Sequence, residues 1–127
     1  MLMIEHPNIM PLKDYYEDDQ NIYLVMDYMV NDLRNMLILL NGKGLTEIFA
    51  RDVFYDILKA INHIHNNGIV HRDIKMENIL VDINESNNSL IIQVSDFGMA
   101  ASDIENDKMN QRAGTLVYMA PEMIQQQ

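Results

Sequence analysis

The spacing of hydrophobic and polar positions along the chain predicts two helices. Apolar residues recur at helical spacing after Thr46, namely Val53, Phe54, Ile57, Leu58, Ile61 and Ile64. Thr46 suits the N-cap of this helix, and the pattern continues until Gly68. A shorter helix is predicted over residues 32–40, where Asn41 and Gly42 end it.

Compact apolar runs between polar stretches predict strands. Ile22–Met26 follows a polar turn and forms one such run. Ile79–Val81 and Leu90–Val94 are rich in β-branched residues, and a stretch of Asp, Asn, Glu and Ser separates them. This arrangement is typical of a β-hairpin. The chain is therefore predicted to be of the α+β class.

Polar side chains stand at the ends of this predicted hairpin. Asp73 and Asn78 precede its first strand, and Asp96 directly follows its second. Antiparallel pairing brings these three residues to the same end of the ribbon. Carboxylate and amide oxygens gathered in this way suit Mg²⁺, which shares its ligands with phosphates. The sequence therefore predicts a Mg²⁺–phosphate site there.

Lys75 and Asp73, in the same loop, suit the chemistry of phosphoryl transfer. Lys75 supplies a mobile ammonium for charge that develops on a transferring phosphoryl group. Asp73, next to the cationic Arg72, is a candidate to orient or deprotonate a hydroxyl. Asp and Asn are also ordinary turn formers. The ordered set of HRD, Lys75, Asn78 and DFG favours the chemical interpretation over the turn interpretation.

These motifs resemble the catalytic domain of eukaryotic protein kinases, and the resemblance runs from HPNI at 6–9 to APE at 120–122. It implies a partial kinase-like fold, with an end of the small lobe, a hinge and the first half of the large lobe. The implied ranges are 1–26 for the small-lobe remnant, 27–32 for the hinge and 33–127 for the large-lobe portion, with the catalytic loop at 71–78, DFG at 96–98 and the activation segment at 96–122.

The resemblance also implies roles for residues of the loop. Asp73 would be the catalytic base, while Asn78 and Asp96 would hold Mg²⁺ ions. Lys75 would contact the transferring phosphate of ATP, and its presence points to serine or threonine of a protein as the acceptor. Thr115 would touch Asp73 and Lys75 near the substrate hydroxyl.

By the same resemblance, the backbone C=O of Asp27 and N–H of Met29 would bind adenine. Asp32 would reach the ribose, and Leu80 is expected among the residues that contact the nucleotide. Met26 would be the gatekeeper at the end of its strand. Taken without the other motifs, this stretch fits a plain buried strand equally well.

The resemblance further implies a spine in which His71 stacks with Phe97, Leu12 and Met1. Arg72 would pair with a phosphate on the activation segment. The usual acceptor position there holds Gln111. We therefore expect that phosphorylation at this position does not activate the protein; Ser102, the single hydroxyl residue between Gly98 and Gly114, lies far from it.

Composition narrows the possible partners. Nine basic against 19 acidic residues give a net charge of -10, which argues against a nucleic-acid or anionic-membrane surface. No apolar run approaches the ~20 residues of a membrane span. The absence of Cys excludes disulfides and thiolate metal sites and suggests an intracellular, cytoplasmic location.

At 127 residues the chain is about half of what two kinase lobes need. We expect it to be incomplete at both ends and to lack the Gly-rich loop, the ATP-binding Lys and the Glu partner of that Lys. Missing kinase-domain portions are then expected partners, and the long helix would keep an uncovered apolar face.

Three interpretations remain open at this point. The layout most resembles the calcium/calmodulin-dependent group of serine/threonine kinases. A catalytically silent kinase-like interaction module is the alternative. A small metal-binding domain built on His63, His65 and His71 is a third possibility, although His63 and His65 would point to different faces of their helix.

Overall fold

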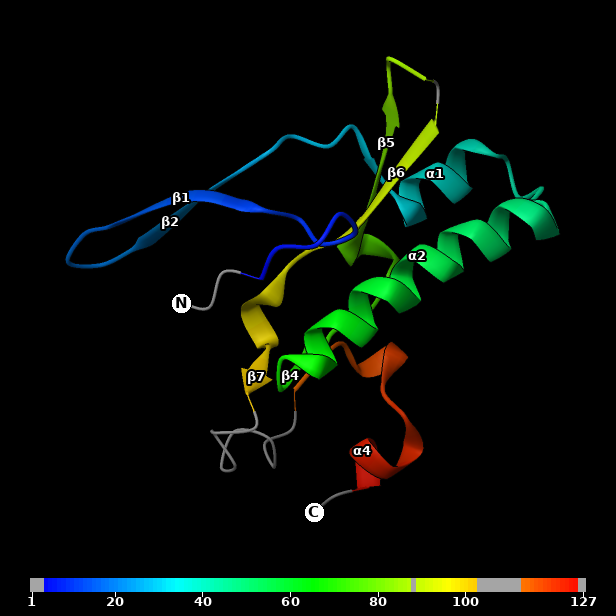
Figure 1. Cartoon of the computed structure of the whole chain (residues 1–127). Coiled ribbons are helices and arrows are strands. Elements are labelled where there is room, and N and C mark those ends of the chain that lie inside the picture. Colours follow the sequence, from blue (N-terminus) through cyan, green and yellow to red (C-terminus); the bar gives the residue numbers. More distant parts are fainter. Residues whose placement is uncertain (1–3, 88, 103–112, 126–127) are drawn as a thin grey trace.

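The computed structural model describes residues 4–87, 89–102 and 113–125 of the chain, and it is of the predicted α+β class. Three short 3₁₀ turns cover Met76–Asn78, Phe97–Met99 and Leu116–Tyr118. The strands and helices, in chain order, are β1 (Leu12–Glu17), β2 (Ile22–Met26), β3 (Asn31–Asp32), α1 (Leu33–Leu39), α2 (Glu47–Asn66), β4 (Ile69–Val70), β5 (Ile79–Asn84), β6 (Ser89–Val94), β7 (Ala101–Ser102) and α4 (Pro121–Gln125) (Figure 1).

Helix α2 is the longest described element, and β4 and β6 pack against it (Figure 1). Thr46 caps it as predicted, because its side-chain oxygen accepts a hydrogen bond from the amide of Phe49 at 3.4 Å. Val53, Ala60 and Ile64 lie on one face and are buried. None of the helices in the described ranges is long and apolar enough to span a membrane.

The predicted hairpin is formed by β5 and β6, which pair antiparallel from Ile79↔Val94 to Asn84↔Ser89. Alternate residues of both strands are buried and join the core around α2, namely Ile79, Val81, Ile92 and Val94. The short strand β3 extends this sheet along β5, where Asp32 pairs with Leu80. The register brings the residues before β5 and after β6 to one end.

The N-terminal segment lies along β6 and fixes one edge of it. The amide of Met10 donates to the Val94 carbonyl, and the amide of Val94 donates to the Asn8 carbonyl, both at 2.9 Å. The Asn8 side chain donates to the Ile92 carbonyl at 3.0 Å. The ring of His6 contacts that of His63 on α2, with centroids 4.9 Å apart. This segment is therefore part of the packed body.

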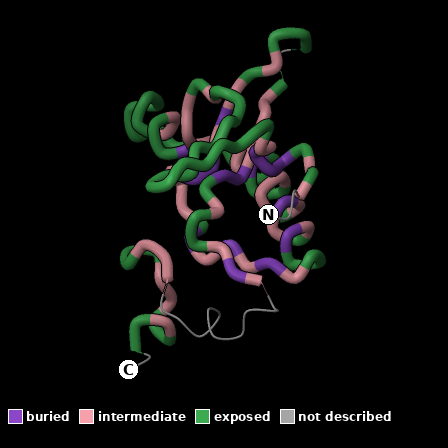
Figure 2. Tube along the Cα trace, turned by 90° about the vertical axis from the view of Figure 1, so that its left-hand side faces the viewer, coloured by how far each residue is buried: buried purple, intermediate pink, exposed green. Residues whose placement is uncertain are grey.

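The hairpin of β1 and β2 differs from the body because it projects away from it (Figure 1). The strand predicted at Ile22–Met26 is confirmed, but the alternative of a buried strand is wrong. All five of its side chains are 40–65% exposed. Figure 2 shows the same contrast, with the buried positions gathered in the body of the molecule. Among the described strands, β1 and β2 pair only with each other.

Part of the apolar pattern of α2 also stays exposed. Val53 and Ile64 are buried, whereas Phe54 and Leu58 face solvent. The two sets lie on different faces of the helix, and the described elements cover only the first. The expected uncovered apolar face is therefore present.

Candidate active site

The carboxylate of Asp73 is the centre of the site, and it lies in the loop between β4 and β5. Its Oδ1 accepts hydrogen bonds from the amide of Thr115 at 2.8 Å and from the hydroxyl of Thr115 at 2.6 Å. Its Oδ2 lies 2.7 Å from Nζ of Lys75 and 3.3 Å from Nδ2 of Asn78. Nζ of Lys75 also lies 2.9 Å from the hydroxyl of Thr115. The structure thus brings together the four predicted residues.

These contacts determine the protonation states of Asp73 and Lys75. Hydrogen bonds from Lys75 and then Thr115 lower the pKa of Asp73 from its usual value to about 2. The hydrogen bond to Asp73 raises the pKa of Lys75. Both groups are therefore charged at neutral pH. A carboxylate of such low basicity orients a hydroxyl through a hydrogen bond rather than removing its proton beforehand.

Asn78 and Asp96 both lie at the end of the β5–β6 hairpin that faces Asp73. The amide of Ser95 donates to the Asn78 carbonyl at 2.9 Å, and Nδ2 of Asn78 donates to the Asp73 carbonyl at 2.9 Å. Asp96 is exposed and has a left-handed backbone with φ 60°, and its Oδ1 accepts from the amide of Gly98 at 3.3 Å. An amide oxygen and a carboxylate are thus held close to the same chain junction.

This donor set fits Mg²⁺. The ion prefers oxygen ligands and usually takes one or two protein groups, with waters and phosphate oxygens completing its coordination. Asn78 and Asp96 offer two such groups. The described residues contain no cluster of three or more His, Cys, Asp or Glu side chains suited to a metal. The proposed histidine metal domain therefore receives no support from these residues.

His71 links the catalytic loop to the DFG motif. Nε2 of His71 donates to the Ser95 carbonyl at 2.9 Å, and its Nδ1 accepts from the amide of Asp73 at 3.2 Å. Its ring contacts Phe97 with centroids 4.8 Å apart. Burial lowers the pKa of His71. Of the other implied spine residues, Leu12 begins β1, while Met1 lies outside the described residues.

Gly114 crosses the catalytic loop at close range. It has φ 112°, and a Cβ at this position would lie 2.5 Å from the carbonyl oxygen of Arg72. Arg72 itself has φ 67°, and its Nε donates to the Met99 carbonyl at 2.6 Å. Ser102 belongs to β7 and pairs with Ile69. The usual phosphate-acceptor position, Gln111, lies outside the described residues, so the expectation that phosphorylation there does not activate the protein stays a prediction.

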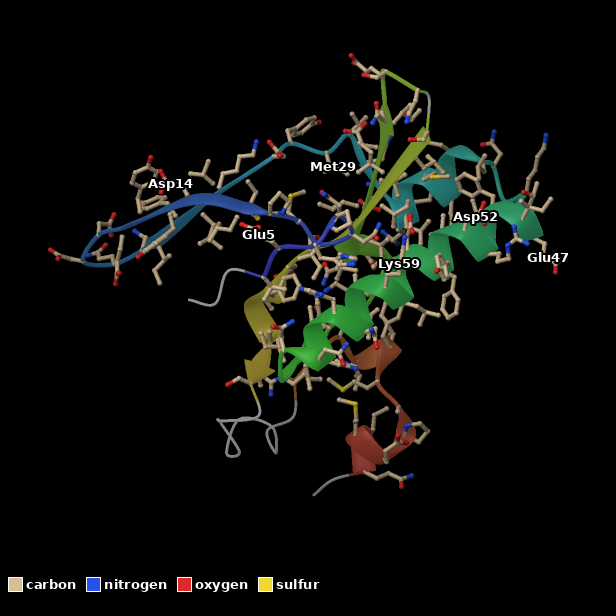
Figure 3. The ribbon with its side chains drawn as sticks, viewed as in Figure 1. Glu5, Asp14, Met29, Glu47, Asp52 and Lys59 are labelled. Atoms are coloured by element: carbon tan, nitrogen blue, oxygen red, sulfur yellow. The ribbon has the colours of Figure 1, made fainter. Side chains whose placement is uncertain are left out.

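The residues implied in nucleotide binding fall into two groups. Asp32 and Leu80 are partners between β3 and β5, and Leu80 is half-buried on the side of β5 opposite to Ile79. Asp27 and Met29 lie on the connection from β2 to α1, where Figure 3 labels Met29. No hydrogen bond or ion pair among the described residues joins Asp27 or Met29 to Asp32 or Leu80. The two pairs are therefore linked only through the chain.

Two of these acidic side chains have structural partners. Both oxygens of Asp32 are used at the start of α1, since one accepts from the amide of Asn35 at 2.8 Å and the other from its side chain at 2.7 Å. Asp27 forms an ion pair with Lys13 at 2.6 Å. A ribose hydroxyl would have to share Asp32 with the cap of α1.

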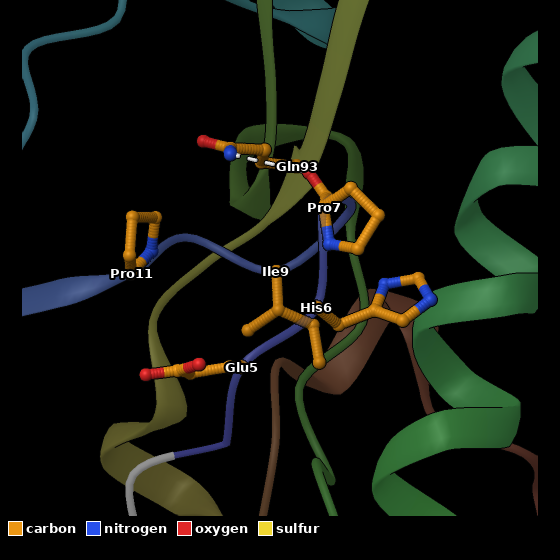
Figure 4. A pocket seen from close by; sticks show the side chains of 6 residues that line it. All are labelled: Glu5, His6, Pro7, Ile9, Pro11 and Gln93. Carbon is orange, nitrogen blue, oxygen red and sulfur yellow. Dashed lines mark hydrogen bonds between the residues drawn. The ribbon is translucent and has the colours of Figure 1, made fainter.

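A cavity of about 430 Å³ lies beside the N-terminal segment, away from Asp73 (Figure 4). None of the predicted site residues lines it. Its walls include Pro7, Pro11 and Gln93, and Nε2 of Gln93 donates to the Pro7 carbonyl at 3.3 Å. The ring of His6 points from this cavity toward α2.

Sequence reasoning missed Ser95. Its carbonyl accepts from His71, and its hydroxyl donates to the Asn78 carbonyl at 3.2 Å. It thereby joins the two halves of the site. The signal available in the sequence was the position of Ser95 directly between the apolar Val94 and Asp96.

The comparisons with known proteins agree with this geometry. The protein kinase domain family matches residues 1–127. Aurora kinase of Saccharomyces cerevisiae is 34% identical over 122 residues, which are 96% of this chain and 32% of that protein. Calcium-dependent protein kinase 4 of Plasmodium falciparum is 37% identical over 123 residues, 96% of this chain and 23% of that protein.

Among solved structures, the crystal structure of the yeast RNA Pol II CTD kinase CTDK-1 complex is similar, with a TM-score of 0.70 and 30% identity. The match covers 94% of this chain and 38% of the yeast chain. The chain spans about a third or less of the length of the two curated relatives. On the match over its whole length, this chain belongs to the protein kinase domain family.

Proposed function

We propose that this chain carries the phosphoryl-transfer site of a serine/threonine protein kinase. The reaction moves the γ-phosphoryl group of ATP to a serine or threonine hydroxyl of a protein. The observation that supports this best is the Thr115 hydroxyl, 2.6 Å from the Asp73 carboxylate and 2.9 Å from the Lys75 ammonium. The site thus already holds a hydroxyl between a carboxylate and an ammonium.

In this proposal, Asp73 orients the acceptor hydroxyl and takes up its proton as the new P–O bond forms. Lys75 stabilises negative charge on the phosphoryl oxygens from a position fixed by Asp73 and Thr115. Asn78 and Asp96 would hold Mg²⁺. When bound, Mg²⁺ and ATP supply charge neutralisation and the phosphoryl group.

Asp27, Met29, Asp32 and Leu80 are the proposed nucleotide contacts. Protein kinases also hold the phosphates with a Gly-rich loop and a strand lysine, and the printed sequence contains neither motif. Loss of one preorganised contact to a transition state costs roughly a hundredfold in rate. We therefore expect these 127 residues alone to transfer phosphate slowly.

The relatives support the serine/threonine class more strongly than any subgroup within it. A calcium-dependent protein kinase is among them, but an Aurora kinase is similarly close, so the relatives do not favour the calcium/calmodulin-dependent group over other serine/threonine kinases. We keep this subgroup, and a cytoplasmic location, as proposals.

The test is a phosphotransfer assay with Mg²⁺-ATP and matched serine and tyrosine peptides. We expect transfer to the serine peptide, and Asp73→Asn should lower kcat about 10²–10⁴-fold. Asp52→Asn is the matched control, because Asp52 is an exposed α2 residue bound to Arg51 alone (Figure 3). Transfer that survives Asp73→Asn unchanged would refute the proposed role.

Nucleotide binding separates this proposal from a silent interaction module. We expect ATP to bind more tightly with Mg²⁺ than without it, and Asp96→Asn to remove that difference. A folded chain that shows no Mg²⁺-dependent nucleotide binding would favour the silent module.

A further inference from the structure

Glu77 joins three separate parts of the chain. Its Oε1 lies 3.4 Å from Nε of Arg34 on α1. Its Oε2 accepts a hydrogen bond from the hydroxyl of Tyr118 at 3.3 Å. Glu77 lies between Lys75 and Asn78 in the catalytic loop. Its side chain forms no hydrogen bond with Asp73 or Thr115. Its carboxylate instead joins α1 to the segment around Tyr118.

Tyr118 belongs to the segment 114–120, which we call the acceptor lip. The lip is attached to the catalytic loop first at Thr115, through the two hydrogen bonds to Asp73. The Tyr118–Glu77 bond is a second attachment three residues further on. The amide of Tyr118 donates to the Thr115 carbonyl at 2.9 Å, so the two attachment points form one rigid turn.

The placement of the acceptor lip shapes a cavity of about 270 Å³ beside Asp73. Arg72, Asp73 and Ile74 line one side of it. Gly114, Thr115, Tyr118 and Met119 of the lip line the other. A shift of the lip relative to the catalytic loop would therefore change the space next to the acceptor hydroxyl.

We propose that Glu77 is a positioning residue for the protein acceptor. It holds the acceptor lip on the catalytic loop through Tyr118, and Arg34 orients the Glu77 carboxylate for that bond. This inference rests on the proposed kinase function. It assigns no contact between Glu77 and ATP or the transferred group.

The contacts are exposed, which limits the expected effect. The Arg34 and Glu77 side chains are 57% and 38% exposed, and pairs of this kind contribute little free energy. We expect a change of about two- to fivefold in the KM for the acceptor, with salt weakening the Arg34 contribution. The KM for ATP and kcat should change by less than about twofold.

The experiment compares Tyr118→Phe, Glu77→Ala and the double variant, with a serine peptide that carries no basic residue. Such a peptide excludes direct pairing between Glu77 and a cationic substrate side chain. Each single variant should raise the peptide KM, and the double variant should raise it no further, because both changes break the same bond. Tyr55→Phe is the control, since its exposed ring on α2 lies 5.0 Å from Nζ of Lys59 and its hydroxyl forms no hydrogen bond with the described residues.

Hydrogen exchange provides a readout that does not depend on activity. The amides of Tyr118 and Met119 donate within the lip turn at 2.9 and 3.2 Å, and Tyr118→Phe should speed their exchange while Tyr55→Phe should not. Unchanged lip exchange in Tyr118→Phe overturns the inference. If wild-type protein transfers no phosphate to any peptide, the proposed function fails and exchange alone tests the attachment. If wild-type is active and the peptide KM does not move, the inference fails and the function stands.

Discussion

Two antiparallel hairpins in the described residues contain apolar strands that lie in opposite environments. The strands β5 and β6 are apolar runs whose alternate residues are at most 5% exposed, namely Ile79, Val81, Ile92 and Val94. The strand β2 is an equally apolar run, yet its residues are at least 40% exposed. The hairpins share their pairing type, so strand geometry does not explain the difference.

The difference lies in what packs against each hairpin. Helix α2 covers one face of β5–β6, and the N-terminal segment bonds along β6. The strands β1 and β2 pair with each other only among the described elements. The hydroxyls of Tyr16 and Tyr23 bind local carboxylates of Asp14 and Asp18 on the surface of this hairpin. An apolar run therefore predicts a strand, while burial depends on a partner elsewhere in the chain.

The largest expected effect tests this contrast by truncating one side chain in each environment. Ile64→Ala removes a fully buried side chain that packs under β5–β6, and we expect it to lower the free energy of unfolding by about 2–5 kcal/mol. Leu24→Ala, on the exposed β2, should cost less than about 1 kcal/mol. Urea unfolding measures both.

Equal losses for Ile64→Ala and Leu24→Ala would contradict the comparison. They would mean that the β1–β2 hairpin is covered in solution. A control of protein concentration would then show whether copies of the chain provide the cover.

A glycine pair sharpens the comparison within the loops. Gly114 and Gly44 both have positive φ, but a Cβ on Gly114 would meet the Arg72 carbonyl at 2.5 Å, while a Cβ on Gly44 would meet nothing within 4 Å. We expect Gly114→Ala to cost about 1–3 kcal/mol and to detach Thr115 from Asp73. Gly44→Ala should cost only the backbone strain, about 1 kcal/mol.

Unfolding and peptide phosphorylation measured on both glycine variants check this prediction. Gly114→Ala should lose transfer activity, whereas Gly44→Ala should keep it. A Gly114→Ala protein with unchanged stability and activity would show that the lip does not approach Arg72 this closely.

The smallest expected effect concerns the N-terminal segment that covers β6. Burial, and then the neighbouring His63 and Lys59, lower the pKa of His6, while Asp56 opposes this. The folded state therefore binds fewer protons than the unfolded state, whose His pKa is about 6.5. Stability from this group is complete above that value and falls as the pH drops below it.

Unfolding free energies at pH 7.5 and pH 5 measure this dependence. His6→Gln should reduce the loss on acidification by a fraction of a kcal/mol, although His71, whose pKa is also lowered by burial, keeps part of the slope. An unaltered slope in His6→Gln would contradict the burial of His6 against α2.

Local signals predicted much of the fold and of the site. The helical spacing and the Thr46 cap located α2, and the polar stretch between two β-branched runs located the β5–β6 turn. Antiparallel register then placed Asn78 and Asp96 at one end. These predictions succeeded because each depends on neighbouring residues alone.

Other features depend on distant partners and left no local trace. The Tyr118–Glu77 bond joins residues 41 positions apart, and no periodicity encodes it. The exposure of β2 likewise depends on which elements pack there. Asp32 shows a mixed case, since the sequence placed it at the start of a short helix but did not predict that it caps this helix through two bonds to Asn35.

The register of β5–β6 also determines where the chain tolerates a change in length. Residues 85–87, which follow β5, are exposed and lie at the end of the hairpin opposite to Asn78 and Asp96. Inserted residues there would cost little, since loop closure depends weakly on length. A single deletion within β5 would instead rotate Ile79 out of the core and Leu80 into it. A chain with a longer or shorter turn at this position would therefore keep Asn78 and Asp96, the proposed Mg²⁺ ligands, at the same end of the hairpin.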